Sequence, residues 1–223
     1  MKKHAWLCAL LALVLALTAC SVSGRTEPTP EPTAVPTASP IPEKVLVIYF
    51  SRTGEMPEVG VIDKGNTEIL AEMIAGRFAS DVYEIVPAEE DRYPESYEEL
   101  YAVALQEKQD KARPALRGEL PDLSGYKTIF IGAPIWHGDW PMILYTFLEG
   151  VDLSGKRVIP FCTSEGSGIS AIRRELSLRC PYSTVEGGLA ILGHVVQNVP
   201  EEAAETLERY FRDLGYVSES SYG

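Results

Sequence analysis

The sequence is poor in the residues from which proteins build zinc centres. It contains three histidines and four cysteines, and these are scattered along 223 residues rather than spaced as metal ligands. Cys8 and Cys20 belong to the first 20 residues, which leaves Cys162 and Cys180. We therefore expect no metal site. The favoured interpretation of the remaining pair is two buried, unpaired thiols, with a disulfide as the alternative.

Basic residues are also scarce, with 20 Lys and Arg against 32 Asp and Glu. The longest basic stretch is Arg173-Arg174, which is too short to follow a phosphate backbone. This composition excludes nucleic-acid binding. An acidic surface remains compatible with a basic protein partner.

The apolar run near the amino terminus is too short for a transmembrane helix. Lys2 and Lys3 precede an almost wholly apolar stretch at 5–17, so residues 1–19 are predicted to be a signal peptide. The segment Leu17-Thr18-Ala19-Cys20 resembles the bacterial lipobox, which implies a lipid on Cys20 and a membrane-anchored, extracytoplasmic protein. Loss of the two lysines leaves 18 basic residues against 32 acidic ones, a net charge near −14.

Residues 20–43 are rich in Pro, Thr, Ser and Glu, and the prolines from Pro28 to Pro42 are too closely spaced for a helix or sheet. We interpret this segment, with its lipidated cysteine, as an extended linker. The folded domain is expected at 44–217, followed by a tail at 218–223.

Short apolar runs alternate with amphipathic stretches after residue 43, which predicts an α/β fold with a doubly wound, five-stranded parallel sheet and helices on both faces. The expected strands, each buried on both faces, are 45–50, 82–86, 128–133, 157–161 and 186–192. The expected helices are 67–78, one that begins with a capping box at Ser96 and Glu99, 141–148, 169–178, and one from Pro200 to Gly215.

In such a sheet, ligands bind beyond the carboxyl ends of the strands. The first strand ends in Ser51-Arg52-Thr53-Gly54, and Asn66-Thr67 opens the next helix, whose free N–H groups favour an anion. Two alternatives stay open. Asn66 and Thr67 can serve equally as helix caps, and Arg52 can pair with a phosphate or face solvent.

The segment 45–54, together with Asn66-Thr67, resembles the phosphate loop of flavodoxins. The segments 132–138 and 160–168 also resemble flavodoxin-like proteins, and the resemblance covers about 44–217. It implies the strand order 2-1-3-4-5 and a bound FMN, with its phosphate on Ser51, Thr53, Asn66 and Thr67 and its ring between the two later loops. The predicted cofactor-binding residues are Ser51, Arg52, Thr53, Gly54, Asn66, Thr67, Ala133, Pro134, Ile135, Trp136, His137, Thr163, Ser164, Glu165, Gly166, Ser167 and Gly168.

Three further features qualify this interpretation. Trp136 offers a flat face to a flavin ring, although a loop tryptophan can also simply pack. His137 and His194 are better interpreted as structural, because no acid or nucleophile motif surrounds them. The 11 residues from Glu55 to Gly65 depart from the compact flavodoxin loop, and we expect an exposed excursion that returns to the helix.

The expected function is electron transfer by an FMN protein tethered outside the cytoplasm, with a redox partner protein or a small-molecule acceptor. The alternatives are an FMN-dependent NAD(P)H quinone or azo reductase, and a non-catalytic binding module. Rapid flavin reduction by NADH or NADPH without a partner would distinguish the reductase.

Replacing Cys20 with Ala should release the protein from membranes, because the acyl chains are the predicted anchor. Membrane fractionation after a high-salt wash measures this. A Cys8→Ala variant is the control and should remain in the membrane fraction. Retention of Cys20→Ala in washed membranes would contradict the lipid anchor.

Overall fold

The computed structural model describes residues 44–90 and 92–216. The predicted signal peptide, Cys20 and the linker therefore lie outside the described residues, as does the predicted tail. Within the described part of the chain, none of the helices is long and apolar enough to cross a membrane.

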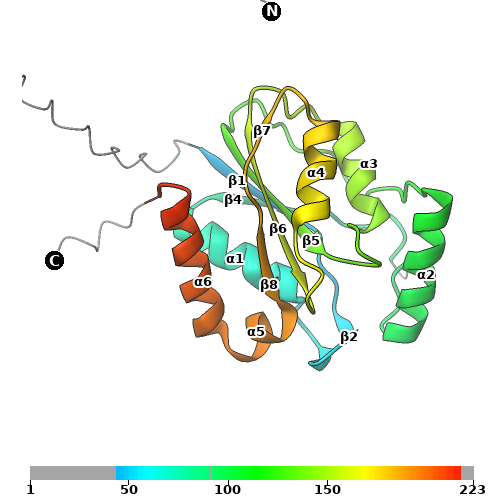
Figure 1. Ribbon diagram of the computed structural model, residues 1–223. Coiled ribbons are helices and arrows are strands. Elements are labelled where there is room, and N and C mark those ends of the chain that lie inside the picture. Colours follow the sequence, from blue (N-terminus) through cyan, green and yellow to red (C-terminus); the bar gives the residue numbers. More distant parts are fainter. Residues whose placement is uncertain (1–43, 91, 217–223) are drawn as a thin grey trace, which may run out of the picture. The chain divides into compact units, whose positions relative to one another are not determined.

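The core of the domain is a parallel sheet (Figure 1). Its strands run in the order β4-β1-β5-β6, and β7 and β8 both pair with β6 on its outer side. Counting β7 and β8 as one interrupted strand, this is the order 2-1-3-4-5, so the predicted fold is confirmed. The strands are β1 (Val45–Tyr49), β4 (Asp81–Glu84), β5 (Thr128–Pro134), β6 (Arg157–Ser164), β7 (Thr184–Val185) and β8 (Leu189–Leu192).

The predicted fifth strand at 186–192 is wrong in its continuity. Only its last four residues are strand, as β8, whereas residues 186–188 are a break and the preceding Thr184–Val185 form the separate strand β7. The break lies beside Pro160 of β6, which has no N–H to donate to a neighbouring strand. The second strand also differs from expectation, because β4 is an edge strand with largely exposed residues rather than a strand buried on both faces.

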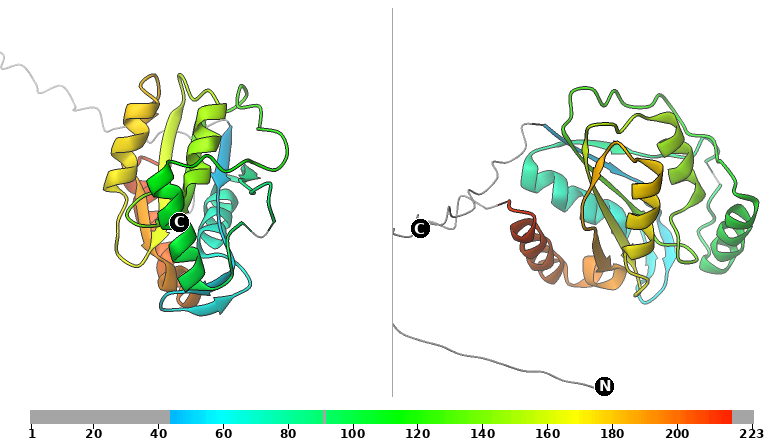
Figure 2. Two further views of the ribbon diagram at one scale, coloured as in Figure 1. Left: turned by 90° about the vertical axis from the view of Figure 1, so that its right-hand side faces the viewer. Right: turned by 45° about the horizontal axis from the view of Figure 1, so that its top comes forward.

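Helices cover both faces of the sheet (Figures 1 and 2). On one face, α1, α5 and α6 pack around Phe130 and Phe211; on the other, α3 and α4 pack around Ile131 and Phe147. Phe130 and Ile131 are neighbours in β5, so the alternation of side chains along a strand supplies both cores. The helices are α1 (Asn66–Phe78), α2 (Tyr97–Asp110), α3 (Met142–Gly150), α4 (Ser170–Arg179), α5 (Gly193–Asn198) and α6 (Pro200–Asp213).

Two helix details differ from expectation. The short helix α5 was not predicted, and it precedes the expected helix at Pro200. The capping box at Ser96 is wrong, because the Ser96 side chain makes no capping hydrogen bond. Instead, Glu55 Oε2 accepts a hydrogen bond from the backbone N–H of Tyr97 at 3.0 Å, so a carboxylate distant in sequence caps α2.

The segment between Gly54 and Gly65 forms a small antiparallel hairpin of β2 (Gly54–Met56) and β3 (Gly60–Ile62). Val61 is 78% exposed, and Ile62, although buried, belongs to neither hydrophobic core. The expected excursion is therefore present, but it is a regular hairpin.

Deleting residues 55–61 should leave a cooperatively folding domain, because Gly54 and Ile62 are paired neighbours that one peptide bond can nearly join. We expect the free energy of unfolding to fall by about 1–3 kcal/mol, because α2 loses the Glu55 carboxylate that caps it and Arg52 loses the Glu55 carbonyl as a hydrogen-bond acceptor. Urea denaturation measures this, with Val61→Ser as an exposed control that should change little. Loss of cooperative unfolding would show that the hairpin completes the core.

Candidate functional site

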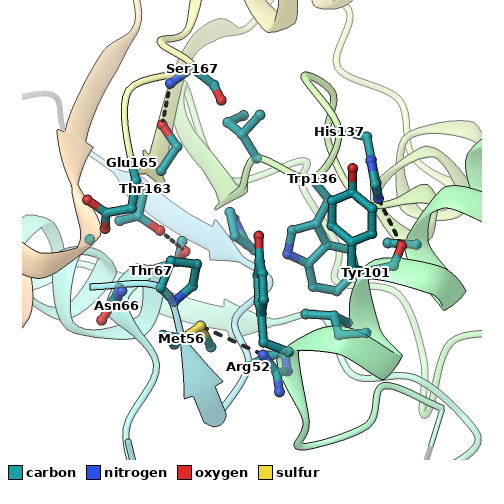
Figure 3. A pocket seen from close by; sticks show the side chains of 18 of the residues that line it. Arg52, Met56, Asn66, Thr67, Tyr101, Trp136, His137, Thr163, Glu165 and Ser167 are labelled. Atoms are coloured by element: carbon teal, nitrogen blue, oxygen red, sulfur yellow. Dashed lines mark hydrogen bonds between the residues drawn. The ribbon is translucent and has the colours of Figure 1, made fainter. Parts of the chain in front are cut away.

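A pocket of about 300 Å³ opens at the carboxyl ends of β1, β5 and β6 (Figure 3). One side is polar and is lined by Ser51, Asn66, Thr67, Thr163, Ser164, Glu165, Ser167 and Gly193. The other side is aromatic, where Figure 3 shows Tyr101, Trp136 and His137, and the remaining uncharged lining residues are Met56, Pro57, Tyr97, Leu100, Ala104, Pro134, Ile135 and Gly138. Arg52 also lines the pocket.

The polar side is built where β1 meets the first turn of α1. Ser51 Oγ accepts a hydrogen bond from the backbone N–H of Glu68 at 3.1 Å, which satisfies one of the free amides at the start of α1. Gly65 allows this approach, since a Cβ there would lie 2.1 Å from Ser51 Oγ. The hydroxyls of Thr67 and Thr163 share a buried hydrogen bond of 2.6 Å, which joins α1 to the end of β6.

Asn66 lies on the polar side and has a buried hydrogen-bond acceptor that no described residue engages. It is 9% exposed, and its Oδ1 has no hydrogen-bond partner among the described residues. A buried polar atom without a partner is costly, so it is available to a ligand hydroxyl.

Glu165 closes the polar side at the start of α5. Its Oε1 accepts the backbone N–H of His194 at 3.0 Å, and its Oε2 lies 2.6 Å from His194 Nδ1. Gly193 makes room for this contact, because a Cβ there would lie 2.4 Å from Asn66 Nδ2 and 2.8 Å from Glu165 Oε1. Figure 3 shows Glu165 on the side of Asn66 and Thr67, across the pocket from Trp136.

The aromatic side depends on a tight turn after β5. The backbones of Trp136 and Asp139 exchange hydrogen bonds of 2.8 and 3.0 Å around His137, whose φ is 51°. The Trp136 ring packs edge-on against Phe50 and Tyr93, with centroid separations of 5.6 and 5.0 Å. These contacts hold the indole at the border of the pocket.

Helix α2 supplies the outer wall and is tied to this turn. The rings of Tyr101 and His137 lie 4.1 Å apart, and His137 Nε2 lies 2.9 Å from the carbonyl oxygen of Tyr101. Lys108 Nζ donates to the carbonyl of His137 at 2.7 Å. Tyr97 and Tyr101, four residues apart on α2, are 40% and 52% exposed and stand at the mouth of the pocket.

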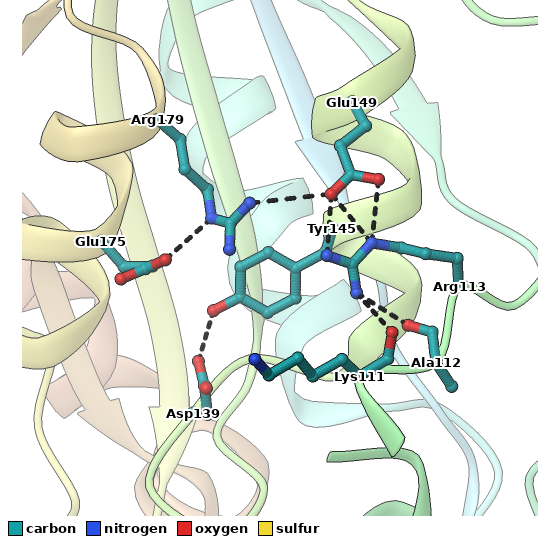
Figure 4. Close-up of polar contacts among 8 residues, drawn as sticks. All are labelled: Lys111, Ala112, Arg113, Asp139, Tyr145, Glu149, Glu175 and Arg179. Carbon is teal, nitrogen blue, oxygen red and sulfur yellow. Dashed lines mark hydrogen bonds and ion pairs between the residues drawn. The ribbon is translucent and has the colours of Figure 1, made fainter. Parts of the chain in front are cut away.

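A second network supports the turn from behind (Figure 4). The Tyr145 hydroxyl donates to Asp139 Oδ1 at 2.5 Å. Arg113 and Arg179 lie over the Tyr145 ring, at 5.4 and 4.5 Å from its centroid, and both contact Glu149. The network therefore holds the Tyr145 ring in place, and the Tyr145 hydroxyl holds the side chain of Asp139, the last residue of the turn.

Arg52 does not face solvent, so that sequence-based alternative is wrong, while its pairing with a phosphate stays a prediction. The side chain is 8% exposed, and its guanidinium donates to the carbonyls of Glu55, Pro94 and Glu95 at 2.9, 2.7 and 2.5 Å. Burial lowers the pKa of Arg52 from its ordinary value, although nearby carboxylates oppose the shift. Arg52 fastens the hairpin to the loop before α2.

Most of the predicted site residues come together in this pocket. The predicted residues that do not line it are Thr53, Gly54, Ala133, Gly166 and Gly168; Thr53 is exposed and borders a second pocket of about 250 Å³. Sequence reasoning missed Met56 and Pro57 of the hairpin, Tyr97, Leu100, Tyr101 and Ala104 of α2, and Gly138 and Gly193. The spacing of Tyr97 and Tyr101 places both on one helical face, but only the fold brings that face to the pocket.

Thiol and metal chemistry find no support at the site. Cys162 and Cys180 are unpaired, as predicted, but only Cys162 is buried, and Cys180 is partly exposed. Burial raises the pKa of the Cys162 thiol to about 12, so it is protonated at neutral pH and a poor nucleophile. Among residues 44–90 and 92–216, no cluster of three His, Cys, Asp or Glu side chains could hold a metal ion.

Comparison with known proteins identifies similar chains. The sequence model of the flavodoxin family matches residues 44–207. A structure from Bacteroides uniformis, described as a candidate flavoprotein, is 34% identical with a TM-score of 0.57, and the match covers 72% of this chain and 97% of that one. A similarly described Bacteroides eggerthii structure is 30% identical with a TM-score of 0.59, covering 78% and 99%.

A more distant structure, a Lactobacillus acidophilus flavoprotein in complex with FMN, is 22% identical with a TM-score of 0.53. The match covers 72% of this chain and 98% of that chain and shows similarity of fold. No match was found among curated proteins.

Replacing Arg52 with Met should lower the free energy of unfolding by about 2–3 kcal/mol, because three backbone carbonyls lose their donor. Chemical denaturation measures this. Lys64→Met is the control: its partner Glu72 is half exposed, and the loss should stay within about 1 kcal/mol. Equal losses in the two variants would contradict the structural role of Arg52.

Proposed function

This chain belongs to the flavodoxin family, and on that premise we propose that its pocket binds FMN and that the protein transfers electrons. The observation that carries the proposal is the division of one pocket into a polar side and an aromatic side. FMN has the matching division, with a phosphate and ribityl chain at one end and a planar ring at the other. When bound, FMN supplies the capacity to accept and release electrons.

The residues present fit such a ligand. The first turn of α1 offers backbone amides and a positive helix end to the phosphate, and the hydroxyls of Ser51 and Thr67 lie beside it. The unpartnered Asn66 Oδ1 suits a hydroxyl of the ribityl chain. These neutral donors can hold a phosphate although the chain as a whole is acidic.

At the other side, Trp136 and the two tyrosines of α2 surround the apolar part of the pocket, where a flavin ring would be shielded from water. Because Tyr97 and Tyr101 are half exposed, this end lies near the surface, which is what a protein needs when it exchanges electrons with a partner or a small acceptor. The proposed location is outside the cytoplasm, with Cys20 lipidated and residues 21–43 as the spacer, a proposal supported by the lipobox resemblance.

The purified full-length protein should show a visible flavin spectrum, or should bind added FMN after the cofactor is removed. Absence of FMN binding in a fluorescence titration would contradict the proposal. Adding NADH or NADPH without a partner then tests the assignment as an electron carrier, since rapid bleaching of the flavin would indicate a reductase instead.

Replacing Trp136 with Ala should weaken FMN binding by about 1–3 kcal/mol and raise the residual flavin fluorescence, because ring stacking is lost. A fluorescence titration measures both effects. Trp140→Phe is the control: Trp140 is 2% exposed and belongs to the core, so this change should affect unfolding rather than flavin emission. Wild-type FMN affinity and emission in Trp136→Ala would show that another residue stacks on the ring.

A further inference from the structure

The turn at 136–139 has a conformation that its own residues do not favour. His137 has a φ of 51° and Gly138 a φ of 72°, and a residue with a side chain rarely adopts this left-handed region. The backbones of Trp136 and Asp139 close the turn with two hydrogen bonds. Because a strained turn persists only where its surroundings hold it, the groups that contact it decide how its side chains are presented to the pocket.

Asp139 is the residue through which helix α3 holds this turn. Its Oδ1 accepts hydrogen bonds from the backbone N–H of Trp140 at 2.8 Å and from the Tyr145 hydroxyl at 2.5 Å (Figure 4). Burial and the Asp139 carboxylate raise the pKa of Tyr145, so the hydroxyl keeps the proton that it donates. The side chain of Asp139 is therefore fixed by a group that belongs to the scaffold.

Helix α2 holds the same turn through a lysine. Lys108 Nζ donates to the carbonyl of His137 at 2.7 Å and lies 3.9 Å from Asp139 Oδ2. Two helices that follow different strands thus meet on one turn. Neither Lys108 nor Tyr145 is among the described residues that line the pocket. They therefore act on a ligand through the turn.

We propose that Tyr145 and Lys108 are positioning residues for the planar part of the ligand, because they hold the 136–139 turn that presents the Trp136 ring to the pocket. That ring also packs edge-on against two aromatic neighbours, which fixes its angle once the turn is in place. The inference rests on the proposed binding of FMN, since it assigns Trp136 to the flavin ring. It does not involve the phosphate, which is expected at the polar side of the pocket.

Replacing Tyr145 with Phe keeps the ring beside its two arginines and removes the hydroxyl that Asp139 accepts. This variant should bind FMN and riboflavin about fivefold more weakly than wild type, because a site loses affinity when its support is loosened. The factor should be the same for both ligands, since riboflavin carries the same ring without the phosphate. Fluorescence titration of the cofactor-free full-length protein measures both affinities, and the residual emission of the bound flavin should rise.

Tyr126→Phe is the matched control. The Tyr126 hydroxyl donates to Asp81 Oδ2 at 2.6 Å, a bond of the same kind at the start of β4 and thus at the edge of the sheet opposite the pocket. Both variants should unfold cooperatively in urea, whereas flavin affinity and emission should change in Tyr145→Phe and stay at wild-type values in Tyr126→Phe. Lys108→Met is an independent second variant and should bind both flavins about threefold more weakly.

A double-mutant cycle tests whether Tyr145 acts through the turn. In a Trp136→Ala background, where stacking is already absent, Tyr145→Phe should cause no further loss of affinity for either flavin. A loss of the same size in both backgrounds would overturn the inference, because Tyr145 would then act on the fold or on another part of the pocket. A loss confined to FMN would also overturn it, since that result would point to the phosphate.

The outcomes separate this inference from the proposed function. Wild-type affinity and emission in both Tyr145→Phe and Lys108→Met would overturn the inference and leave the binding of FMN standing. If the wild-type protein binds neither flavin, the proposed function fails and the inference fails with it.

Discussion

The pocket depends on the parallel pairing of β1, β5 and β6. Because parallel neighbours end at the same edge of a sheet, Ser51 and Trp136, which follow β1 and β5, meet Thr163 near the end of β6 at one site. The buried hydrogen bond between Thr67 and Thr163 then joins the start of α1 to the end of β6. Gly65 lets Ser51 approach the same end of α1, since a Cβ there would lie 2.1 Å from Ser51 Oγ.

The arginine among the described pocket residues joins parts of the scaffold. Arg52 is desolvated and holds the carbonyls of Glu55, Pro94 and Glu95, which brings the hairpin against the loop that leads into α2. A separate contact engages the Glu55 carboxylate, which accepts the backbone N–H of Tyr97 and so caps α2. The polar side of the pocket otherwise presents amides and hydroxyls, and its one carboxylate among the described lining residues, Glu165, is paired with His194.

Much of the fold and part of the site could be predicted from local patterns. Apolar runs such as Val45–Tyr49 identify buried strands, and the loop residues that follow them belong to the carboxyl edge whatever the rest of the chain does. Contacts between segments that are distant in sequence leave no such local pattern. The Glu55 cap of α2 and the pairing of Glu165 with His194 join residues 42 and 29 positions apart, and neither partner carries a motif for the other.

The sequence by itself determined the alternation of strands and helices, the strand order through its family resemblance, and the loops at which a ligand should bind, because periodicity and loop chemistry are local properties. Tertiary structure alone decided which groups those loops face. It bound the Arg52 guanidinium to backbone carbonyls, brought Tyr97 and Tyr101 to the mouth of the pocket, and placed His194 against Glu165. Such choices depend on which elements pack together and on how much water is excluded between them, and no single segment of the chain contains that information.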